Sequence, residues 1–323
     1  MKADFKEAAA TLEQASRVVV VSHVRPDGDG VGSLLAMTHL LEKMGKEAAP
    51  VLADGVPARF RFLPGADRVA KALPQQASLT VAVDCSDPER IGFPPDRLPG
   101  GCALSFDHHA TNTHFARTNV VDADAVATAE VLYDFALDRG LPLDAELATN
   151  LLTGIVTDTI GFRTPNVTPK VLRMVASLIE AGASLADVYD RALNRRSLSA
   201  ARYWGFGLAS LGLEDGVVWA TLTAEDRKKA GYPGADDADL INILGTLEGA
   251  EVALAFVEQP GGKVKVSWRS RSELDVAALA QQFGGGGHEP AAGAMIEGSL
   301  EHVKARVLSA TRALMRPVPG TGQ

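Results

Sequence analysis

Residues 17–33 read RVVVVSHVRPDGDGVGS, and they give the strongest indication of how the chain begins to fold. The opening segment, Arg17 to Val21, is a β-branched run typical of a strand buried on both faces of a parallel sheet. One imidazole and two carboxylates, those of His23, Asp27 and Asp29, follow directly after it. Because open α/β sheets bind ligands at the carboxyl ends of their strands, this position favours a ligand site.

Glycines are interspersed through the same residues, at Gly28, Gly30 and Gly32. We expect them to let the backbone turn sharply and approach an ion or a phosphate closely. Asp and Gly are also ordinary turn residues, so an acidic surface turn is the alternative interpretation. A helix expected over Val31 to Lys43 would begin beside this loop and direct the positive end of its dipole toward the site.

Three further segments end in candidate ligands, which weakens the surface-turn interpretation. Strand-like Leu79–Val83 precedes Asp84, strand-like Ala103–Phe106 precedes Asp107, His108 and His109, and helix-like Glu146–Thr157 precedes Asp158. One aspartate at the end of a strand usually only starts a turn, but several together with histidines indicate metal binding. Carboxylates and imidazoles without thiolates suit manganese, magnesium, iron or zinc, and spacing alone does not choose among them.

The bulk composition predicts a two-domain protein that does not enter a membrane. A chain of 323 residues exceeds one typical domain. With 46% hydrophobic residues and a mean hydropathy of +0.04, it can form sizeable cores. No apolar run approaches the ~18 residues that span a bilayer, and a signal-type segment is not expected at the start. The two cysteines, Cys85 and Cys102, lack paired spacing, which favours a reducing cytoplasm and excludes a thiolate zinc site.

The formal net charge of −8 bears on the substrate. Proteins that bind long nucleic acids make many phosphate contacts and are usually basic over a broad face. An acidic chain can still bind nucleic acid through a local patch, but this charge more readily suits a short or small phosphorylated substrate. Acidic residues gathered around metal ions would contribute to the same balance.

Short apolar strands alternate with helices, which predicts an α/β fold. The first domain is expected over residues 1–190, as a doubly wound, mainly parallel sheet. A helical linker is expected over 191–212 and a second, smaller α/β domain over 213–316. The tail, residues 317–323, is expected to be disordered.

The second domain carries a candidate phosphate site. Glu251–Glu258 and Lys263–Arg271 are separated by a turn sequence and predict a hairpin. Alternate residues of its second strand share one face because strand side chains have a period of two. These residues are Lys263, Lys265, Ser267, Arg269 and Arg271. Four cations without an acid on that face suit a phosphate, although a solvated face with lysines guarding an edge strand is the alternative.

Four successive glycines, Gly284 to Gly287, precede His288. Glycine is costly to order, so a flexible linker is the default interpretation of such a run. The run is short, however, and lies between segments that look structured. We therefore interpret it as a loop whose backbone amides hold a phosphate or a nucleotide.

Together these motifs resemble the DHH phosphoesterase family, whose name-giving motif stands here as Asp107-His108-His109. The resemblance covers nearly the whole chain and extends to the family's associated C-terminal domain. The two-domain length is similar to that of the stand-alone nanoRNase and 3′-phosphoadenosine 5′-phosphate phosphatase type. This resemblance implies an enzyme that hydrolyses very short oligoribonucleotides (nanoRNA) to mononucleotides. It also implies removal of the 3′-phosphate from 3′-phosphoadenosine 5′-phosphate.

The resemblance further implies two divalent metal ions, most often manganese. One ion would be bound by His23, Asp27 and Asp84. The other would be bound by Asp29, Asp84, His108 and Asp158, so that Asp84 bridges the two.

Catalytic and substrate-binding roles follow from the same resemblance. His109 would contact the scissile phosphate, and Asp107 would orient an imidazole. The substrate's nucleotide or terminal phosphate would be held by second-domain residues, namely Ser267, Arg269, Arg271, Gly285, Gly286, Gly287 and His288.

Other functions are weighed against this one. A RecJ-like exonuclease on longer single strands is disfavoured by the acidic charge and the lack of an added nucleic-acid module. A phosphodiesterase for cyclic di-adenylate or for its linear dinucleotide is a further alternative, and the sequence barely distinguishes these two activities. A non-catalytic nucleotide- or RNA-binding module would have a degraded ligand set. A dinucleotide-binding oxidoreductase is excluded because Ser33 breaks the G-x-G-x-x-G pattern. The sequence leaves homodimer formation open.

Overall fold

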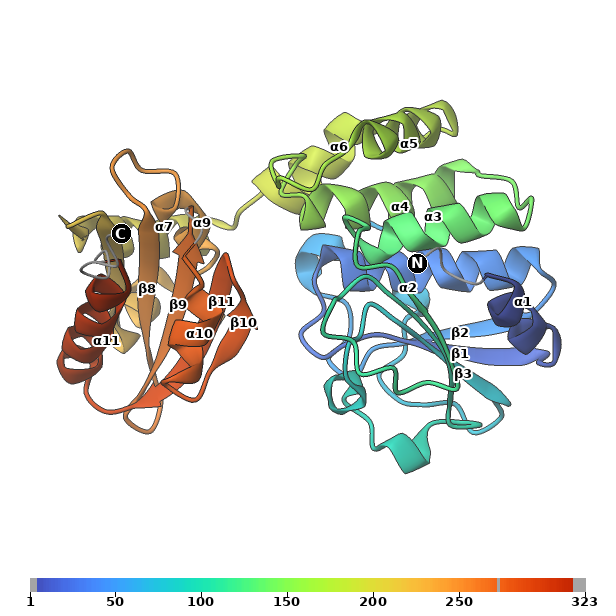
Figure 1. Ribbon diagram of the computed structural model, residues 1–323, viewed down its shortest axis with the longest axis horizontal. Coiled ribbons are helices and arrows are strands. Elements are labelled where there is room, and N and C mark those ends of the chain that lie inside the picture. The colour runs from blue at the N-terminus through green and yellow to red at the C-terminus, as the bar shows by residue number, and fades with distance from the viewer. Residues whose placement is uncertain (1–4, 272–273, 316–323) are drawn as a thin grey trace, which may run out of the picture. The chain divides into compact units, whose positions relative to one another are not determined.

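The computed structural model describes residues 5–271 and 274–315, apart from the side chain of His288 (Figure 1). The tail predicted over 317–323 lies outside these residues. The chain divides into two compact units, residues 1–195 and 196–323, and each is described by itself.

The first unit is built on a five-stranded parallel sheet. Its strands are β1 (Arg17–Val21), β2 (Glu47–Val51), β3 (Leu79–Val83), β4 (Cys102–Asp107) and β5 (Thr118–Val121). Their order is β2-β1-β3-β4-β5, and every neighbouring pair is parallel. The apolar, β-branched strands are buried because both faces of the sheet are covered. The predicted α/β fold with a parallel sheet is confirmed.

The two faces of this sheet are covered differently. The helices are α1 (Phe5–Glu13), α2 (Gly28–Lys43), α3 (Thr128–Asp138), α4 (Ala145–Asp158), α5 (Pro169–Glu180) and α6 (Leu185–Tyr189). They contribute to the main hydrophobic core, together with one side of β1, β3 and β4. A smaller core on the opposite side involves the short 3-10 helix η3 (Pro88–Ile91). The other one-turn helices are η1 (Ala58–Phe60), η2 (Ala66–Arg68) and η4 (Pro95–Arg97), and the π-helical turn η5 (Asp190–Asn194) ends the unit.

Helix α2 begins at Gly28, three residues before the expected start at Val31. Asp27 is its N-cap, and its Oδ1 accepts hydrogen bonds from the amides of Asp29 (3.1 Å) and Gly30 (3.0 Å). The expected loop around Asp27 and Asp29 is therefore the first turn of a helix. An N-cap carboxylate explains this, because it satisfies amides that otherwise have no partner in the helix.

Two glycines of α2, Gly28 and Gly32, serve helix packing, and the sharp turn expected from the glycines is wrong. Among Gly28, Gly30 and Gly32 none has a positive φ. A Cβ atom added to Gly28 would lie 2.4 Å from the side chain of Thr157 on α4. One added to Gly32 would lie 2.5 Å from the backbone oxygen of Asn150 on the same helix. Their missing side chains therefore allow α4 to pack closely on α2.

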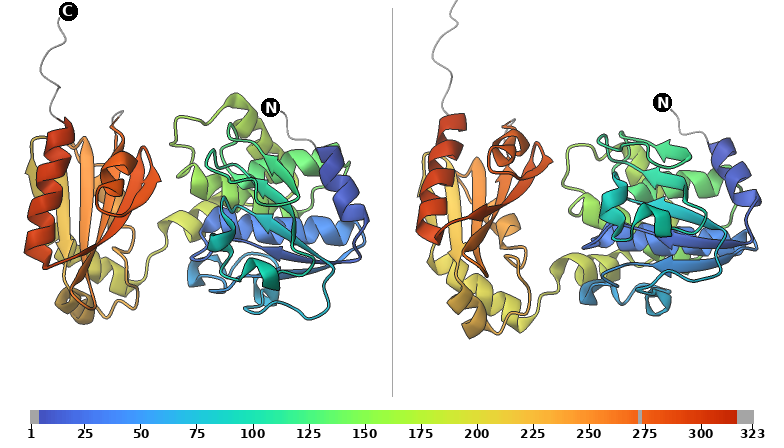
Figure 2. Two further views of the ribbon diagram at one scale, coloured as in Figure 1. Left: turned by 60° about the horizontal axis from the view of Figure 1, so that its bottom comes forward. Right: turned by 90° about the horizontal axis from the view of Figure 1, so that it is seen from below.

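The second unit holds a six-stranded mixed sheet (Figure 2). Its strands are β6 (Gly212–Glu214), β7 (Val217–Leu222), β8 (Val252–Gln259), β9 (Lys263–Ser270), β10 (Gly286–His288) and β11 (Ala291–Glu297). Their order is β10-β11-β9-β8-β7-β6, with β7 and β8 parallel and the other pairs antiparallel. The predicted hairpin is confirmed as β8 and β9.

Helices cover both faces of this second sheet. They are α7 (Leu198–Ala209), α8 (Ala224–Ala230), α9 (Leu240–Leu244), α10 (Val276–Gln281) and α11 (Leu300–Met315). Helices α10 and α11 enclose one core with Trp268, whereas α7 and α9 enclose another with Tyr203. Across the described residues, no helix has the length and apolar character that crossing a membrane requires.

The predicted glycine loop is only partly observed, because Gly286 and Gly287 lie in an edge strand while Gly284, in a turn, and Gly285 precede it. Gly286 to His288 form β10, which pairs antiparallel with β11. A Cβ atom added to Gly285 would lie 2.2 Å from the backbone oxygen of Gly293, and one added to Gly287 would lie 2.4 Å from that of Ala291. Glycine is needed here because the neighbouring strand approaches too closely for a side chain. The proposed binding role of these residues stays a prediction.

Candidate metal centre

Strand register brings the sequence motifs to one edge of the first sheet. Val21 of β1 is paired with Ala82 of β3, and Val83 of β3 with Phe106 of β4. Asp84 therefore follows β3 beside the end of β1, which leads to His23, and Asp107 ends β4 on the other side. The strand order reverses between β1 and β3, and ligands of doubly wound sheets bind at such a switch point.

Three groups of side chains at this edge could each hold a metal ion. They are His23, Asp27 and Asp84; Asp29, His108 and Asp158; and Asp84, His108 and His109. Within each group, the candidate ligand atoms lie within 4.8 Å of one another. The structure thus brings together all six residues that the sequence suggested as metal ligands.

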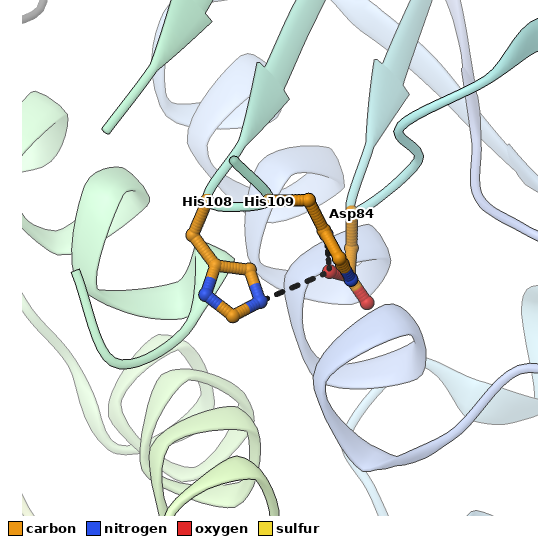
Figure 3. A group of neighbouring side chains, drawn as sticks. All are labelled: Asp84, His108 and His109. Carbon is orange, nitrogen blue, oxygen red and sulfur yellow. Dashed lines mark ion pairs between the residues drawn. The ribbon is translucent and has the colours of Figure 1, made fainter. Parts of the chain in front are cut away.

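Asp84 belongs to two of these groups, and Figure 3 shows the one that it forms with His108 and His109. Its Oδ2 is 3.4 Å from His23 Nε2, whereas its Oδ1 is 3.8 Å from His108 Nε2. The Oδ1 atom also lies 3.7 Å from Nδ1 of His109. Asp84 is 2% exposed and has a φ of 53°, a left-handed conformation that is uncommon for a residue other than glycine. Such strain persists where the surrounding structure holds the residue in place, and it is frequent at functional sites.

Backbone carbonyls orient two of the imidazoles. The Nδ1 atom of His23 donates to the carbonyl oxygen of Val24 (3.0 Å), and that of His108 donates to the carbonyl oxygen of Ala125 (3.2 Å). A carbonyl oxygen only accepts, so the neutral ring carries its proton on Nδ1 and leaves a lone pair on Nε2. Each Nε2 faces carboxylates, which is the arrangement that metal-binding histidines adopt.

Asp29 is held by the start of α3. Its side chain is fully buried and accepts hydrogen bonds from the hydroxyl of Ser33 (2.9 Å) and the amides of Thr128 (2.6 Å) and Ala129 (3.1 Å). Burial and the nearby carboxylates of Asp84 and Asp158 raise the pKa of Asp29. The positive end of the α3 dipole opposes this effect and keeps the carboxylate in place.

The aspartates gathered at this edge of the sheet are stabilised by positive charge. Burial raises the pKa of Asp158 to about 6. Burial also disfavours charged imidazoles, but hydrogen bonds to Asp27 and Asp84 outweigh it and raise the pKa of His23 to about 10. The pKa of His108 rises to about 11, because its hydrogen bond to Asp158 likewise outweighs burial. Imidazole protons thus balance the carboxylates here, and divalent cations fit the same oxygen and nitrogen atoms.

Asp107 organises a second network beside this cluster. It is fully buried and accepts hydrogen bonds from Nδ1 of His109 (2.8 Å), the amide of His108 (2.9 Å) and Nδ2 of Asn112 (2.6 Å). Burial disfavours its charge, but the bonds from His109 and Asn112 outweigh burial and lower the pKa of Asp107. His109 is thereby fixed through Nδ1.

Two residues of the site, Thr128 and Asn112, were not identified from the sequence. The hydroxyl of Thr128 donates to Asp84 Oδ1 at 3.0 Å. Threonine and asparagine are common at helix starts and turns, so residue type gave no signal. The position of Asn112, three residues after the DHH motif, was the only cue available.

The second-unit residues lie along β9 and β10. Alternation along β9 is as predicted, with Val266 and Trp268 in the core on one side and Ser267 and Arg269 on the other. Burial lowers the pKa of Arg269, and the carboxylates of Asp237 and Asp239 oppose that change. Asp237 and Asp239 precede α9 and do not belong to β9, so the sequence of the strand alone could not predict that they lie near Arg269. Arg271 follows β9 and is exposed.

Two family descriptions match the chain. Residues 17–155 match the DHH family, N-terminal domain, and residues 217–316 match the DHHA1 domain. The chain belongs to the DHH family. The DHH motif itself ends β4 and provides His108 and His109 to the groups around Asp84.

One curated relative and two solved structures are similar to this DHH protein. The bifunctional oligoribonuclease and PAP phosphatase NrnA of Thermus thermophilus is 39% identical over 91% of this chain and 89% of that protein. The crystal structure of an exopolyphosphatase-related protein from Bacteroides fragilis has a TM-score of 0.89 at 24% identity, covering 97% of both chains. The structure of RecJ with Mn²⁺ from Thermus thermophilus has a TM-score of 0.59 at 18% identity, and covers 99% of this chain but 56% of RecJ. The two structures share the fold of this chain.

Proposed function

We propose that this DHH protein is a metal-dependent phosphoesterase that acts on very short oligoribonucleotides and on 3′-phosphoadenosine 5′-phosphate. Two candidate metal groups at the sheet's switch point carry this proposal: His23, Asp27 and Asp84 form one, and Asp29, His108 and Asp158 form the other. Asp84 belongs to the first, and its Oδ1 lies 3.8 Å from His108 Nε2 of the second. The function for which the Thermus relative is named supports the choice of substrates, since the two chains match along nearly their whole length. A binding module without catalysis would not require this complete set of ligands.

The residues present fit two divalent ions. His23, Asp27 and Asp84 would hold one, and Asp29, Asp84, His108 and Asp158 would hold the other. Manganese is the proposed metal, as in the RecJ structure named above. When bound, two such ions would lower the pKa of water and stabilise charge on the attacking and leaving oxygens at the phosphorus atom.

The chain's own residues would bind and orient the substrate. His109, held through Nδ1 by Asp107, would direct Nε2 to the scissile phosphate and stabilise its developing charge. Ser267, Arg269, Arg271 and the run from Gly285 to His288 would hold the nucleotide or its terminal phosphate. In this assignment residues 1–190 are the catalytic domain, 191–212 the linker and 213–316 the substrate-binding domain. We also assign the protein to the cytoplasm, because both cysteines, Cys85 and Cys102, are free thiols.

A substrate panel with manganese tests the proposal. We would offer 3′-phosphoadenosine 5′-phosphate, dinucleotides and RNAs up to about twenty nucleotides to the purified protein, with and without a chelator. We expect release of adenosine 5′-phosphate and of mononucleotides from the shortest RNAs, and loss of both when the metal is removed. Faster cleavage of the long strands than of dinucleotides would instead indicate a RecJ-like exonuclease. Binding of nucleotides without any release would indicate a non-catalytic module.

A further inference from the structure

We propose that Thr128 is a positioning residue that fixes the bridging orientation of Asp84 and makes this edge of the sheet a two-ion site. The inference rests on the metal centre proposed above. It goes beyond that proposal because Thr128 is not one of the proposed ligands but a neighbour that contacts two of them.

Thr128 contacts two of the proposed ligands at once. It is the first residue of α3 and is fully buried. Its hydroxyl donates to Oδ1 of Asp84 at 3.0 Å, and its amide donates to Oδ2 of Asp29 at 2.6 Å. Asp84 follows β3 and Asp29 lies on α2, so one residue links carboxylates from two elements. Asp84 is assigned to both ions, and Asp29 is assigned to one of them.

The hydroxyl matters because a bridging carboxylate must present one oxygen to each side. Oδ2 of Asp84 faces His23, at 3.4 Å, and Oδ1 lies 3.8 Å from His108. The hydroxyl of Thr128 occupies one acceptor position of Oδ1 and opposes rotation of the carboxylate. Its own direction is restricted because threonine is branched at Cβ. Without it, a buried oxygen would lose a partner and Asp84 could turn toward one ion at the expense of the other.

This use of the hydroxyl differs from that of two buried threonines inside neighbouring helices. Thr38 on α2 and Thr153 on α4 donate to carbonyl oxygens one turn earlier in their own helices, Leu34 at 2.7 Å and Thr149 at 2.8 Å. The N-cap of α3 is Ala127, which has no side chain that could cap. Asp29 therefore accepts from the first amides of α3, and Thr128 directs its hydroxyl out of the helix to Asp84.

A set of substitutions separates the hydroxyl from the shape of the side chain. Thr128→Val keeps the shape and the amide but removes the hydroxyl, and Thr128→Ser restores a hydroxyl. Thr38→Val is the matched control, because it makes the same change in a buried helical threonine that contacts no proposed ligand. Manganese binding to metal-free protein would be measured by titration calorimetry, alongside hydrolysis of a dinucleotide and the Tm.

We expect Thr128→Val to bind manganese about 10- to 100-fold more weakly, the range typical for loss of a residue that orients a metal ligand. Thr128→Ser should regain most of the affinity, and Thr38→Val should bind as the parent does. Hydrolysis by Thr128→Val should recover partly when manganese is raised.

Parent-like affinity of a folded Thr128→Val would overturn the inference. If that variant does not fold, Thr128→Ser and Thr128→Ala give the same comparison, since they differ only by the hydroxyl oxygen; equal affinity of these two would also overturn it. If the parent binds manganese but releases no nucleotide, the proposed function fails while the role of Thr128 can still be measured.

Discussion

Asp84 is the one residue that we assign to both proposed metal ions. Its two oxygens face different histidines, its backbone is left-handed, and Thr128 holds its orientation. A buried carboxylate with these neighbours is favourable only if positive charge lies beside it, because an unpaired ion in the interior is costly. Removing this side chain should therefore affect both proposed ions at once.

We predict that Asp84→Ala lowers kcat more than about a hundredfold even at saturating manganese, because loss of one electrostatic contact to a transition state commonly costs that much. Steady-state rates on a dinucleotide would measure the effect. The exposed carboxylate of Asp124, removed in Asp124→Ala, is the control and should leave the rate near that of the parent. Near-normal turnover of a folded Asp84→Ala would contradict the bridging role.

Residue types revealed the candidate ligands but not the residues that orient them. His23, Asp84 and Asp107 were recognisable because each follows a predicted strand, and strand ends of a parallel sheet share one edge. Thr128 and Asn112 act through contacts with residues far away in the chain, which no local pattern reports.

At the scale of elements, contact between α2 and α4 positions the site. Helix α2 carries Asp27 at its N-cap and Asp29 in its first turn, and α4 ends in Asp158. The sequence indicated both helices but assigned the glycines of α2 to a turn. Their packing role depends on which helix lies across them, and helical periodicity alone cannot supply that partner.

We predict that Gly32→Ala destabilises the protein by about 1–3 kcal/mol, as overpacking of a tight contact does. The added Cβ would lie 2.5 Å from the backbone oxygen of Asn150, so one helix must shift. Gly205→Ala is the control: Gly205 is exposed within α7, and no atom lies within 4 Å of its added Cβ. It should gain up to about 1 kcal/mol from helix propensity. Urea unfolding measures the stability of both variants against the parent. Equal stability of Gly32→Ala and the parent would show that α2 and α4 are not closely packed at Gly32.

An ion-pair cluster at the other end of α4 joins the same helices. Oδ2 of Asp144 lies 2.6 Å from Nζ of Lys43 and 2.9 Å from Nε2 of His39, both on α2. The amide of Leu147 also donates to Oδ1 of Asp144, at 3.0 Å. Burial disfavours the charge, but the hydrogen bonds from Lys43 and Leu147 outweigh burial and hold the pKa of Asp144 well below its usual range.

This lowered pKa predicts the pH dependence of stability. A carboxylate with a lower pKa in the folded state stabilises above its unfolded pKa of about 4, and this contribution is lost as pH falls toward the folded pKa. The difference in free energy of unfolding between the parent and Asp144→Asn should thus be largest above about pH 5 and shrink in acid. Urea unfolding of metal-free protein at several pH values measures it, with exposed Asp96→Asn as control. A difference that does not change with pH would show that the ion-pair cluster around Asp144 does not stabilise the folded protein.

At the scale of the whole molecule, each unit has a hydrophobic core of its own. The cores of the first unit lie within residues 1–195, and those around Trp268 and Tyr203 lie within 196–323. The candidate metal groups found among the described residues all lie in the first unit. Ions that bind there stabilise the fold that binds them, and leave the unfolding of a separate core unchanged.

We predict that manganese stabilises only the first unit. At a hundredfold excess over its Kd the metal should add about 2.7 kcal/mol to the free energy of unfolding of that unit. Scanning calorimetry would follow the transitions with manganese and with a chelator, and hydrogen exchange would assign the shifted one to residues 1–195. Asp84→Ala should abolish the shift, because it removes a ligand from both proposed ions. Equal protection of both units by manganese, or an unchanged shift in Asp84→Ala, would place the metal elsewhere in the molecule.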